Sequence, residues 1–154
     1  GYNGTIKIND RDLSKIKITD LRKIIAYAPQ DPYLFKGTVL ENIKIANPAV
    51  DDLTIKTLLD SFEIPYLYDR EINSGGNELS GGEKQKISLI RAIIKDSLVI
   101  FMDEPENNLD SSAMKTVEKF ILDSDKTIIF ISHSPLLIEN ADKQIILESH
   151  TINP

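Results

Sequence analysis

Apolar residues recur every three or four positions in three segments of the chain, which is the spacing of one helix face. The predicted helices are residues 51–62, 82–95 and 111–122. Their inward faces are expected to consist of Ile55, Leu58, Leu59 and Phe62; Ile87, Ile90 and Ile94; and Met114, Val117 and Ile121. Residues 38–43 form a shorter piece, which is helical or irregular.

Other segments have the composition and length of β-strands. Residues 4–10 (GTIKIND) alternate apolar and polar side chains, and residues 22–30 (RKIIAYAPQ) form a second strand that a proline ends. Residues 97–104 (SLVIFMDE) and 126–133 (KTIIFISH) contain unbroken apolar runs, which predict strands buried on both faces of a parallel sheet. Residues 144–147 (QIIL) predict a last short strand.

The order of these elements predicts the fold class. Strands and helices alternate along the chain, so we expect an α/β fold with a parallel sheet flanked by helices. The two early strands suggest a small antiparallel part beside that sheet. A length of 154 residues fits one domain, or a large piece of one.

Composition and charge narrow the range of functions. The net charge of −6 argues against a nucleic-acid partner, because surfaces that bind nucleic acid are normally basic. The sequence has no apolar run long enough to cross a membrane, and its first residues lack the pattern of a signal peptide. It contains no cysteine, which excludes disulfides and thiolate metal sites and fits a cytoplasmic protein.

Two adjacent glycines follow a serine in the stretch NELSGGEKQK, residues 77–86. Ser80 and Glu83 have the spacing of a capping box, in which each side chain binds a free amide at the start of a helix. Gly81 and Gly82 leave the amides of the first turn uncovered by any β-carbon, and a bare helix N-terminus attracts anions. From spacing alone, a simple helix cap and a phosphate site are both open.

Adjacent carboxylates, Asp103 and Glu104, end the apolar strand LVIFMDE. In open α/β sheets, ligands bind at the carboxyl ends of the strands, and two adjacent acids repel each other unless a cation is near. The economical assignment is that Asp103 holds Mg²⁺ through water and Glu104 orients or deprotonates an attacking water. A pair of solvated acids at a strand end is the alternative.

Two further polar residues follow strands. His133 ends the strand in FISHS and is expected at the same sheet edge as Asp103, where it would donate a hydrogen bond to a phosphate oxygen. Gln30 comes directly after the proline that ends the strand in residues 22–30, so its neutral amide could touch both water and metal. A structural role is the alternative for each, since a lone histidine is usually structural.

Five motifs together give the chain a family resemblance. The stretches AYAPQ, LSGGE, LVIFMDE, NNLD and ISH occur in the order and approximate spacing of the ATP-binding-cassette (ABC) ATPases, and resemble their Q-loop, signature motif, Walker B strand, D-loop and H-loop. The segment QDPYLFKGTVLENI is similar to the one that follows the Q-loop in exporter-type transporters, including bacteriocin and peptide exporters.

The resemblance implies hydrolysis of ATP with Mg²⁺, coupled to transport across a membrane. It implies that Asp103 serves Mg²⁺, that Glu104 is the general base, and that His133 clamps the γ-phosphate. Gln30 would sense metal and water while its loop touches the transmembrane domain of the transporter. The protein would then lie at the cytoplasmic side of the cell membrane.

The resemblance also implies a second nucleotide-binding domain, because members of the family dimerise head to tail. Ser80, Gly81 and Gly82 would meet the γ-phosphate of an ATP held by the opposite subunit, and Asp110 would cross the dimer interface. Three parts are expected: a β part at 1–29, a helical signature part at 30–95, and a part with Walker B, D-loop and H-loop at 96–154.

No glycine of the chain begins the P-loop pattern G-x-x-x-x-G-K-[ST], which binds the phosphates in this class. In the family this Walker A motif lies upstream, so the chain resembles the C-terminal portion of a nucleotide-binding domain. We therefore expect the isolated chain to bind ATP weakly or not at all, and not to hydrolyse it. We also expect an open edge on the strand at 126–133, since the family places a strand of the missing segment in this sheet.

Two other functions fit parts of the sequence. A soluble ABC-type ATPase acting on DNA or ribosomes is one, because LSGGEK occurs in chromosome-maintenance relatives. Those relatives carry long coiled coils inside the cassette, however, and no heptad run exists between Gln30 and Leu79. A non-catalytic binding subunit is the other, which the intact Asp103, Glu104 and His133 argue against.

The chain also departs from exporters at Asn73 and Ser74, where a Gly-Glu pair is usual, and at Glu83, where glutamine is frequent.

Overall fold

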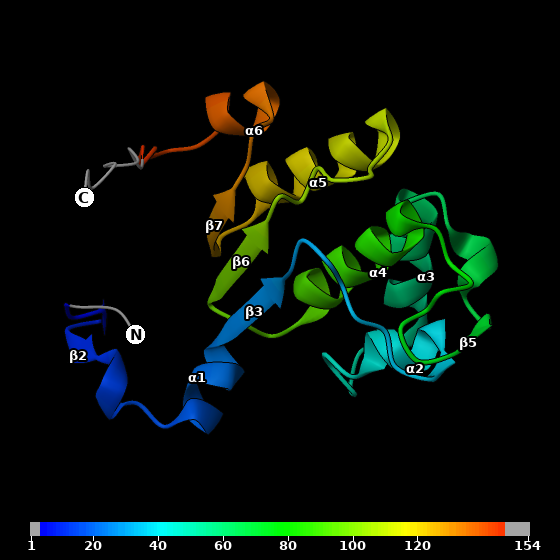
Figure 1. The fold of residues 1–154 in the computed structure, drawn as a ribbon, viewed down its shortest axis with the longest axis horizontal. Helices are drawn as coiled ribbons and strands as arrows, with labels where there is room; N and C mark the ends of the chain where they lie inside the picture. Colours follow the sequence, from blue (N-terminus) through cyan, green and yellow to red (C-terminus); the bar gives the residue numbers. More distant parts are fainter. Residues whose placement is uncertain (1–3, 147–154) are drawn as a thin grey trace, which may run out of the picture.

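The computed structural model describes residues 4–146 (Figure 1). Its strands are β1 (Lys7–Ile8), β2 (Arg11–Asp12), β3 (Ile25–Ala28), β4 (Gly37–Thr38), β5 (Glu71–Ile72), β6 (Val99–Asp103) and β7 (Thr127–Ile131). Its α-helices are α1 (Ile18–Ile24), α2 (Val39–Lys44), α3 (Asp52–Ser61), α4 (Gly81–Ile94), α5 (Ser111–Asp123) and α6 (Pro135–Glu139). Two 3₁₀ turns are η1 (Leu13–Lys15) and η2 (Pro65–Leu67).

A three-stranded parallel sheet in the order β3-β6-β7 forms the centre of the fold. The strands are paired in register, so that Tyr27, Phe101 and Ile129 lie side by side across the sheet. Two small antiparallel pairs, β1 with β2 and β4 with β5, accompany it. The α/β fold with a parallel sheet is therefore confirmed.

The buried core lies between one face of this sheet and the helices. Strand residues Ala26, Ala28, Ile100 and Met102 belong to the same buried cluster as the helix faces. The predicted helix stripes are confirmed except at Met114, which is half-buried and does not belong to this cluster. The other predicted residues are buried or packed against the core: Ile55, Leu58 and Leu59 of α3 with Phe62 at its C-cap, Ile87, Ile90 and Ile94 of α4, and Val117 and Ile121 of α5. Helix α4 lies against β3, which fixes the stretch LSGGE at the start of α4 relative to the sheet (Figure 1).

The other face of the sheet is open. Tyr27, Phe101 and Ile129 are 57%, 36% and 47% exposed, respectively. The expectation that β6 and β7 are buried on both faces is thus wrong for this structure, because no described element covers this row. The predicted open edge is present, since β7 pairs only with β6 among the described strands.

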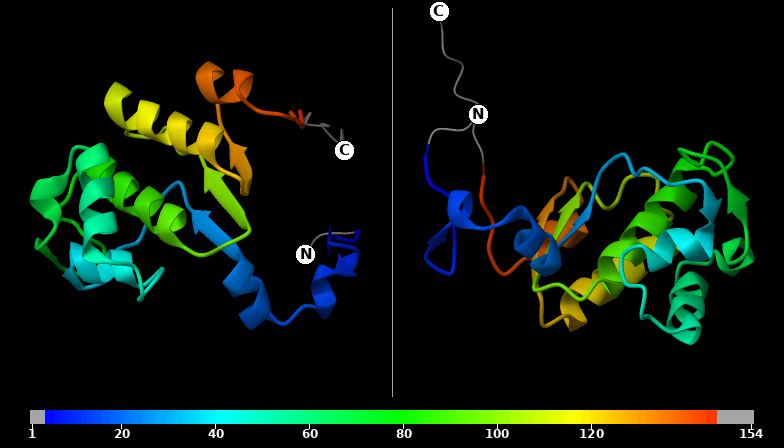
Figure 2. Two further views of the ribbon diagram at one scale, coloured as in Figure 1. Left: turned by 180° about the vertical axis from the view of Figure 1, so that it is seen from behind. Right: turned by 90° about the horizontal axis from the view of Figure 1, so that it is seen from below.

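The strand boundaries differ from the sequence predictions at both ends of the chain. Residues 22–24 belong to α1, and the strand that follows is limited to β3, which is parallel to β6 and no part of an antiparallel unit. The β1–β2 pair lies apart from the central sheet (Figure 2). The last predicted strand is absent from residues 144–146, and Leu147 lies outside the described residues.

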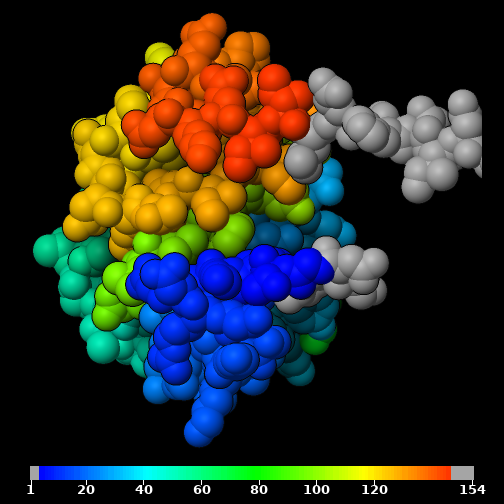
Figure 3. Space-filling view, turned by 90° about the vertical axis from the view of Figure 1, so that its left-hand side faces the viewer, coloured from blue at the N-terminus to red at the C-terminus, as the bar shows by residue number. Residues whose placement is uncertain are grey.

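The first and last described segments lie on the same side of the molecule. The space-filling view shows the blue N-terminal segment and the orange-to-red segment around and after α6 on this side (Figure 3). Between residues 4 and 146, no helix is both long and apolar enough to cross a membrane.

The open face and edge lead to a prediction about association. We expect the chain to self-associate at high concentration, since an unpaired strand edge beside exposed apolar residues binds other chains. Replacing Ile129 with lysine adds a charge to this row and should reduce the association, as measured by light scattering. Leu53→Lys is the control, because Leu53 is an exposed apolar residue of α3. A monomeric wild-type chain, or an equal effect of both variants, would contradict the prediction.

Candidate functional site

The loops that follow β3, β6 and β7 meet at the carboxyl edge of the sheet, as expected for parallel strands. Glu104 lies at their centre. Its Oε2 accepts a hydrogen bond from the side-chain amide of Gln30 at 2.5 Å and another from that of Asn107 at 2.6 Å. Two neutral donors therefore hold one oxygen of this carboxylate, and the other accepts no hydrogen bond from residues 4–146.

The free oxygen of Glu104 faces His133. Nε2 of His133 lies 3.7 Å from Oε1 of Glu104, which is longer than a hydrogen bond. The backbone of Glu104 has φ 46°, in the left-handed region that non-glycine residues rarely adopt. Strain of this kind is concentrated at functional sites, where surrounding contacts maintain it.

Asp103 ends β6 next to this group. The hydroxyl of Tyr27 lies 3.5 Å from its Oδ2, at the limit of a hydrogen bond. Within residues 4–146, no three histidine or acidic side chains are grouped as a metal site of their own. Asp103 and Gln30 alone therefore offer at most a partial shell of oxygen ligands.

A second group of predicted residues lies at the start of α4. Ser80 and Glu83 form the expected capping box: the Ser80 hydroxyl accepts from the Glu83 amide at 3.2 Å, and Glu83 accepts from the Ser80 amide at 2.7 Å. Tyr66 donates a hydrogen bond to the same carboxylate at 2.9 Å. Burial raises the pKa of Glu83, but hydrogen bonds from Ser80 and Tyr66 outweigh it and hold that pKa below its usual value.

The paired glycines have a packing role that the sequence did not reveal. A β-carbon on Gly82 would lie 2.6 Å from the carbonyl oxygen of Asn108, and one on Gly81 would lie 3.3 Å from the Asn108 side chain. Asn108 itself has a left-handed backbone, with φ 58°. The loop after β6 thus packs directly on the first turn of α4.

Asp110 joins the same loop to two helices. It is the N-cap of α5, accepting from the Ala113 amide at 2.8 Å, and it pairs with Lys86 of α4 at 2.6 Å. The Lys86 side chain is only 9% exposed. The Ala113 amide, followed by the Lys86 ammonium, lowers the pKa of Asp110.

The predicted site residues therefore form two groups. Gln30, Asp103, Glu104 and His133 meet at the sheet edge, whereas Ser80, Gly81, Gly82 and Asp110 line a surface hollow of about 770 Å³ at the start of α4. Sequence reasoning missed Asn107, Asn108, Tyr66 and Lys86, which hold these groups in place. For Asn107 and Asn108 a signal was present, since both belong to the stretch NNLD that the sequence singles out as a motif.

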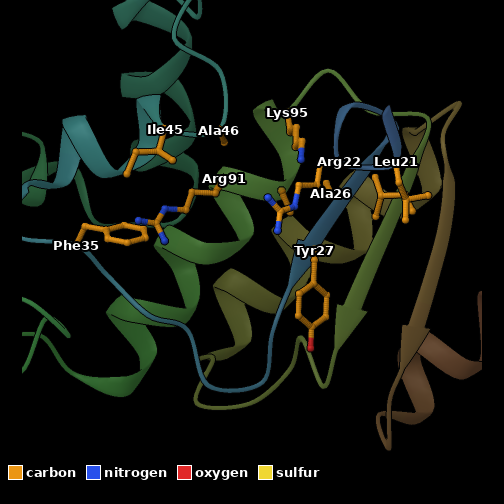
Figure 4. A pocket seen from close by; sticks show the side chains of 11 residues that line it. Leu21, Arg22, Ala26, Tyr27, Phe35, Ile45, Ala46, Arg91 and Lys95 are labelled. Atoms are coloured by element: carbon orange, nitrogen blue, oxygen red, sulfur yellow. The ribbon is translucent and has the colours of Figure 1, made fainter. Parts of the chain in front are cut away.

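A further hollow of about 440 Å³ lies between α1, β3, α2 and α4 (Figure 4). Arg91 crosses it and donates hydrogen bonds at 2.9 Å to the carbonyl oxygens of Asn42 and Tyr33. Burial lowers the pKa of Arg91 to about 10. Arg91 thereby ties α4 to the segment that follows Gln30.

The chain is similar to transport proteins. A family model described as ABC transporter matches residues 1–107. The chain is 36% identical to the pediocin PA-1 transport/processing ATP-binding protein PedD of Pediococcus acidilactici, over 95% of this chain and 21% of that protein. It is 33% identical to the transport/processing ATP-binding protein ComA of Streptococcus pneumoniae, over 97% of this chain and 22% of that protein.

The structure also resembles a solved one. It matches the structure of a bacterial Atm1-family ABC exporter with ATP bound, with a TM-score of 0.78 and 27% identity, over 92% of this chain and 26% of that chain. The chain thus spans about a fifth of the length of the two curated relatives, at 21% and 22%.

The contact between Gly82 and Asn108 can be tested with alanine. Gly82→Ala places a β-carbon against a backbone oxygen, so we expect a loss of about 1–3 kcal/mol in the free energy of unfolding. Gly81→Ala meets only a movable side chain and should be neutral or stabilising by up to about 1 kcal/mol. Urea denaturation measures both, and equal effects of the two variants would contradict the packing role.

The ion pair of Asp110 predicts a pH dependence. Asp110→Asn keeps a good N-cap but leaves the buried Lys86 ammonium without its carboxylate, so we expect a loss of roughly 1–2 kcal/mol at pH 7. Because the pKa of Asp110 is lowered on folding, its contribution is present above the unfolded pKa and is lost as the pH falls through the folded pKa. The difference between wild type and variant should therefore shrink below about pH 4. Urea denaturation across this range tests it, and a constant difference would contradict it.

Proposed function

Because the chain belongs to the ABC transporter family, we propose that it forms part of a nucleotide-binding domain that hydrolyses ATP to ADP and phosphate to drive export across a membrane. One observation carries the catalytic part of this proposal. Glu104, at the carboxyl edge of the sheet, is held by Gln30 and Asn107 through one oxygen, while its other oxygen faces His133.

This geometry suits a general base. A carboxylate oxygen free of hydrogen bonds accepts a proton more readily than one already bound to two amides. Oε1 of Glu104 would take the proton of a water that attacks the γ-phosphate, and Oε2 would remain held. His133 would donate a hydrogen bond to an oxygen of that phosphate.

Mg²⁺ fits the oxygen donors of this edge. Asp103 would hold the ion together with the Gln30 side-chain oxygen, since the Gln30 nitrogen is the atom that binds Glu104. A partial protein shell suits Mg²⁺, which usually keeps several waters and takes other ligands from the nucleotide phosphates. When bound, the ion would neutralise charge on those phosphates.

The group at the start of α4 would serve a second subunit. Ser80, Gly81 and Gly82 line an exposed hollow, and amides at a helix start attract phosphate. In a head-to-tail dimer these residues would meet ATP bound by the other copy, with Asp110 at the interface. The three parts of the domain would be a β part up to residue 29, a helical signature part at 30–95, and a core part from residue 96.

Transport is proposed from the relatives. Two relatives similar over nearly all of this chain are named transport/processing ATP-binding proteins, and the solved neighbour is an exporter. The chain would act with a transmembrane domain on the cytoplasmic side of the membrane. A soluble ABC-type ATPase acting on DNA or ribosomes is the second candidate, but the acidic net charge of −6 does not favour it.

The proposal can be tested by calorimetry with ATP and Mg²⁺. We compare this chain with a version extended upstream through the expected P-loop. We expect only the extended version to bind tightly and turn over, because the P-loop supplies most phosphate contacts in this class. Glu104→Gln should preserve binding and lower turnover by about 10²–10⁴-fold.

The control is Glu71→Gln, which makes the same change at an exposed strand residue. Equal activity of Glu104→Gln and this control would contradict the assignment of the base. If the short chain turns over ATP and this turnover depends on Glu104, the P-loop is dispensable. The proposed assignment of phosphate binding to the P-loop is then wrong.

A further inference from the structure

Glu106 lies in the loop after β6 and holds the loop after β7. One carboxylate oxygen, Oε1, accepts hydrogen bonds from the Ser132 hydroxyl and the His133 amide at 2.7 Å each, and from the Ser134 amide at 3.2 Å. Donors from three consecutive residues therefore meet at a single oxygen. Hydrogen bonds to a carboxylate are stronger than those between neutral groups.

This contact begins where the sheet ends. The last backbone hydrogen bond between the two loops runs from the Glu104 amide to the Ile131 carbonyl at 2.8 Å. Beyond it β7 has ended, so the next amides need acceptors other than a neighbouring strand. Glu106 supplies the acceptor for His133 and shares Ser134 with the Ser132 hydroxyl, which lies 3.0 Å from that amide.

The side chain of His133 has little else to hold it. Its side chain is 87% exposed, and among the described residues its one ion-pair contact within 4.0 Å is with Glu104, at 3.7 Å. The hydrogen bond that holds His133 among the described residues is therefore made by its backbone, which sets the point from which the ring extends. That backbone is anchored to Glu106.

The other carboxylate oxygen of Glu106 does not bind a second loop among the described residues. Oε2 is buried and has no hydrogen-bond partner among the described residues. All hydrogen bonds that the described residues give this carboxylate thus come from the loop that carries His133. Among the described residues this side chain bonds to one loop alone, so it is well placed to set the position of that loop.

We propose that Glu106 is a positioning residue that fixes His133 against Glu104, so that the loops after β6 and β7 move as one unit. It acts through the backbone of His133 and does not touch the nucleotide. The inference rests on the proposed function, because the phosphate contact of His133 is part of that function.

Amide hydrogen exchange followed by NMR tests the contact itself. In Glu106→Ala, we expect the amides of His133 and Ser134 to exchange at least about tenfold faster, while amides of the central strand β6 keep their protection. Glu106→Gln retains one acceptor oxygen and should give an intermediate rate. Glu139→Gln, at an exposed position of α6, is the control and should change neither amide. Unchanged exchange in Glu106→Ala, or an equal loss of protection throughout β6, would overturn the proposal.

Kinetics of the version extended upstream separate this inference from the proposed function. We expect Glu106→Ala to lower kcat by about tenfold or more with little change in KM, and Glu106→Gln to restore part of it. If Glu104→Gln abolishes turnover but Glu106→Ala leaves kcat unchanged, the positioning role is wrong and the proposed function stands. If Glu104→Gln leaves turnover intact, the proposed function fails, and with it the catalytic meaning of Glu106.

Discussion

The parallel pairing of β6 with β3 on one side and β7 on the other is the constraint on which the rest of the structure depends. It places the ends of three strands at one edge, although Gln30 and Glu104 are 74 residues apart in the chain. Because the strands are paired in register, they end close to the same line across the sheet, and the loops that follow them begin side by side. This arrangement brings the two side chains within hydrogen-bond distance.

The segment from Glu104 to Asp110 connects that edge to the start of α4. Successive residues of the segment face different partners: Glu104 contacts Gln30, Asn108 packs on Gly82, and Asp110 binds Lys86. Two of these residues, Glu104 and Asn108, have left-handed backbones, so the chain turns sharply twice within the segment. The two groups of site residues are therefore parts of one continuous arrangement.

Much of this could be predicted from the sequence, for identifiable physical reasons. Helical faces such as Ile55, Leu59 and Phe62 follow from periodicity, and the cap formed by Ser80 and Glu83 follows from spacing. The contact of Gly82 with Asn108 could not be predicted, because it depends on tertiary packing between distant segments. The exposure of Phe101 could not be predicted either, because an apolar run shows that a strand can be buried but not what covers it.

The shared loop also limits how this domain can be recombined with its relatives. A chimera that takes only the loop after β6 from another protein would pair a foreign residue 106 with the native Ser132–Ser134 stretch, and a foreign residue 108 with the native Gly82. Each of those contacts needs one partner from the loop after β6 and one from the loop after β7 or the first turn of α4. The loop after β6, the loop after β7 and the first turn of α4 therefore form one module, to be exchanged together or not at all.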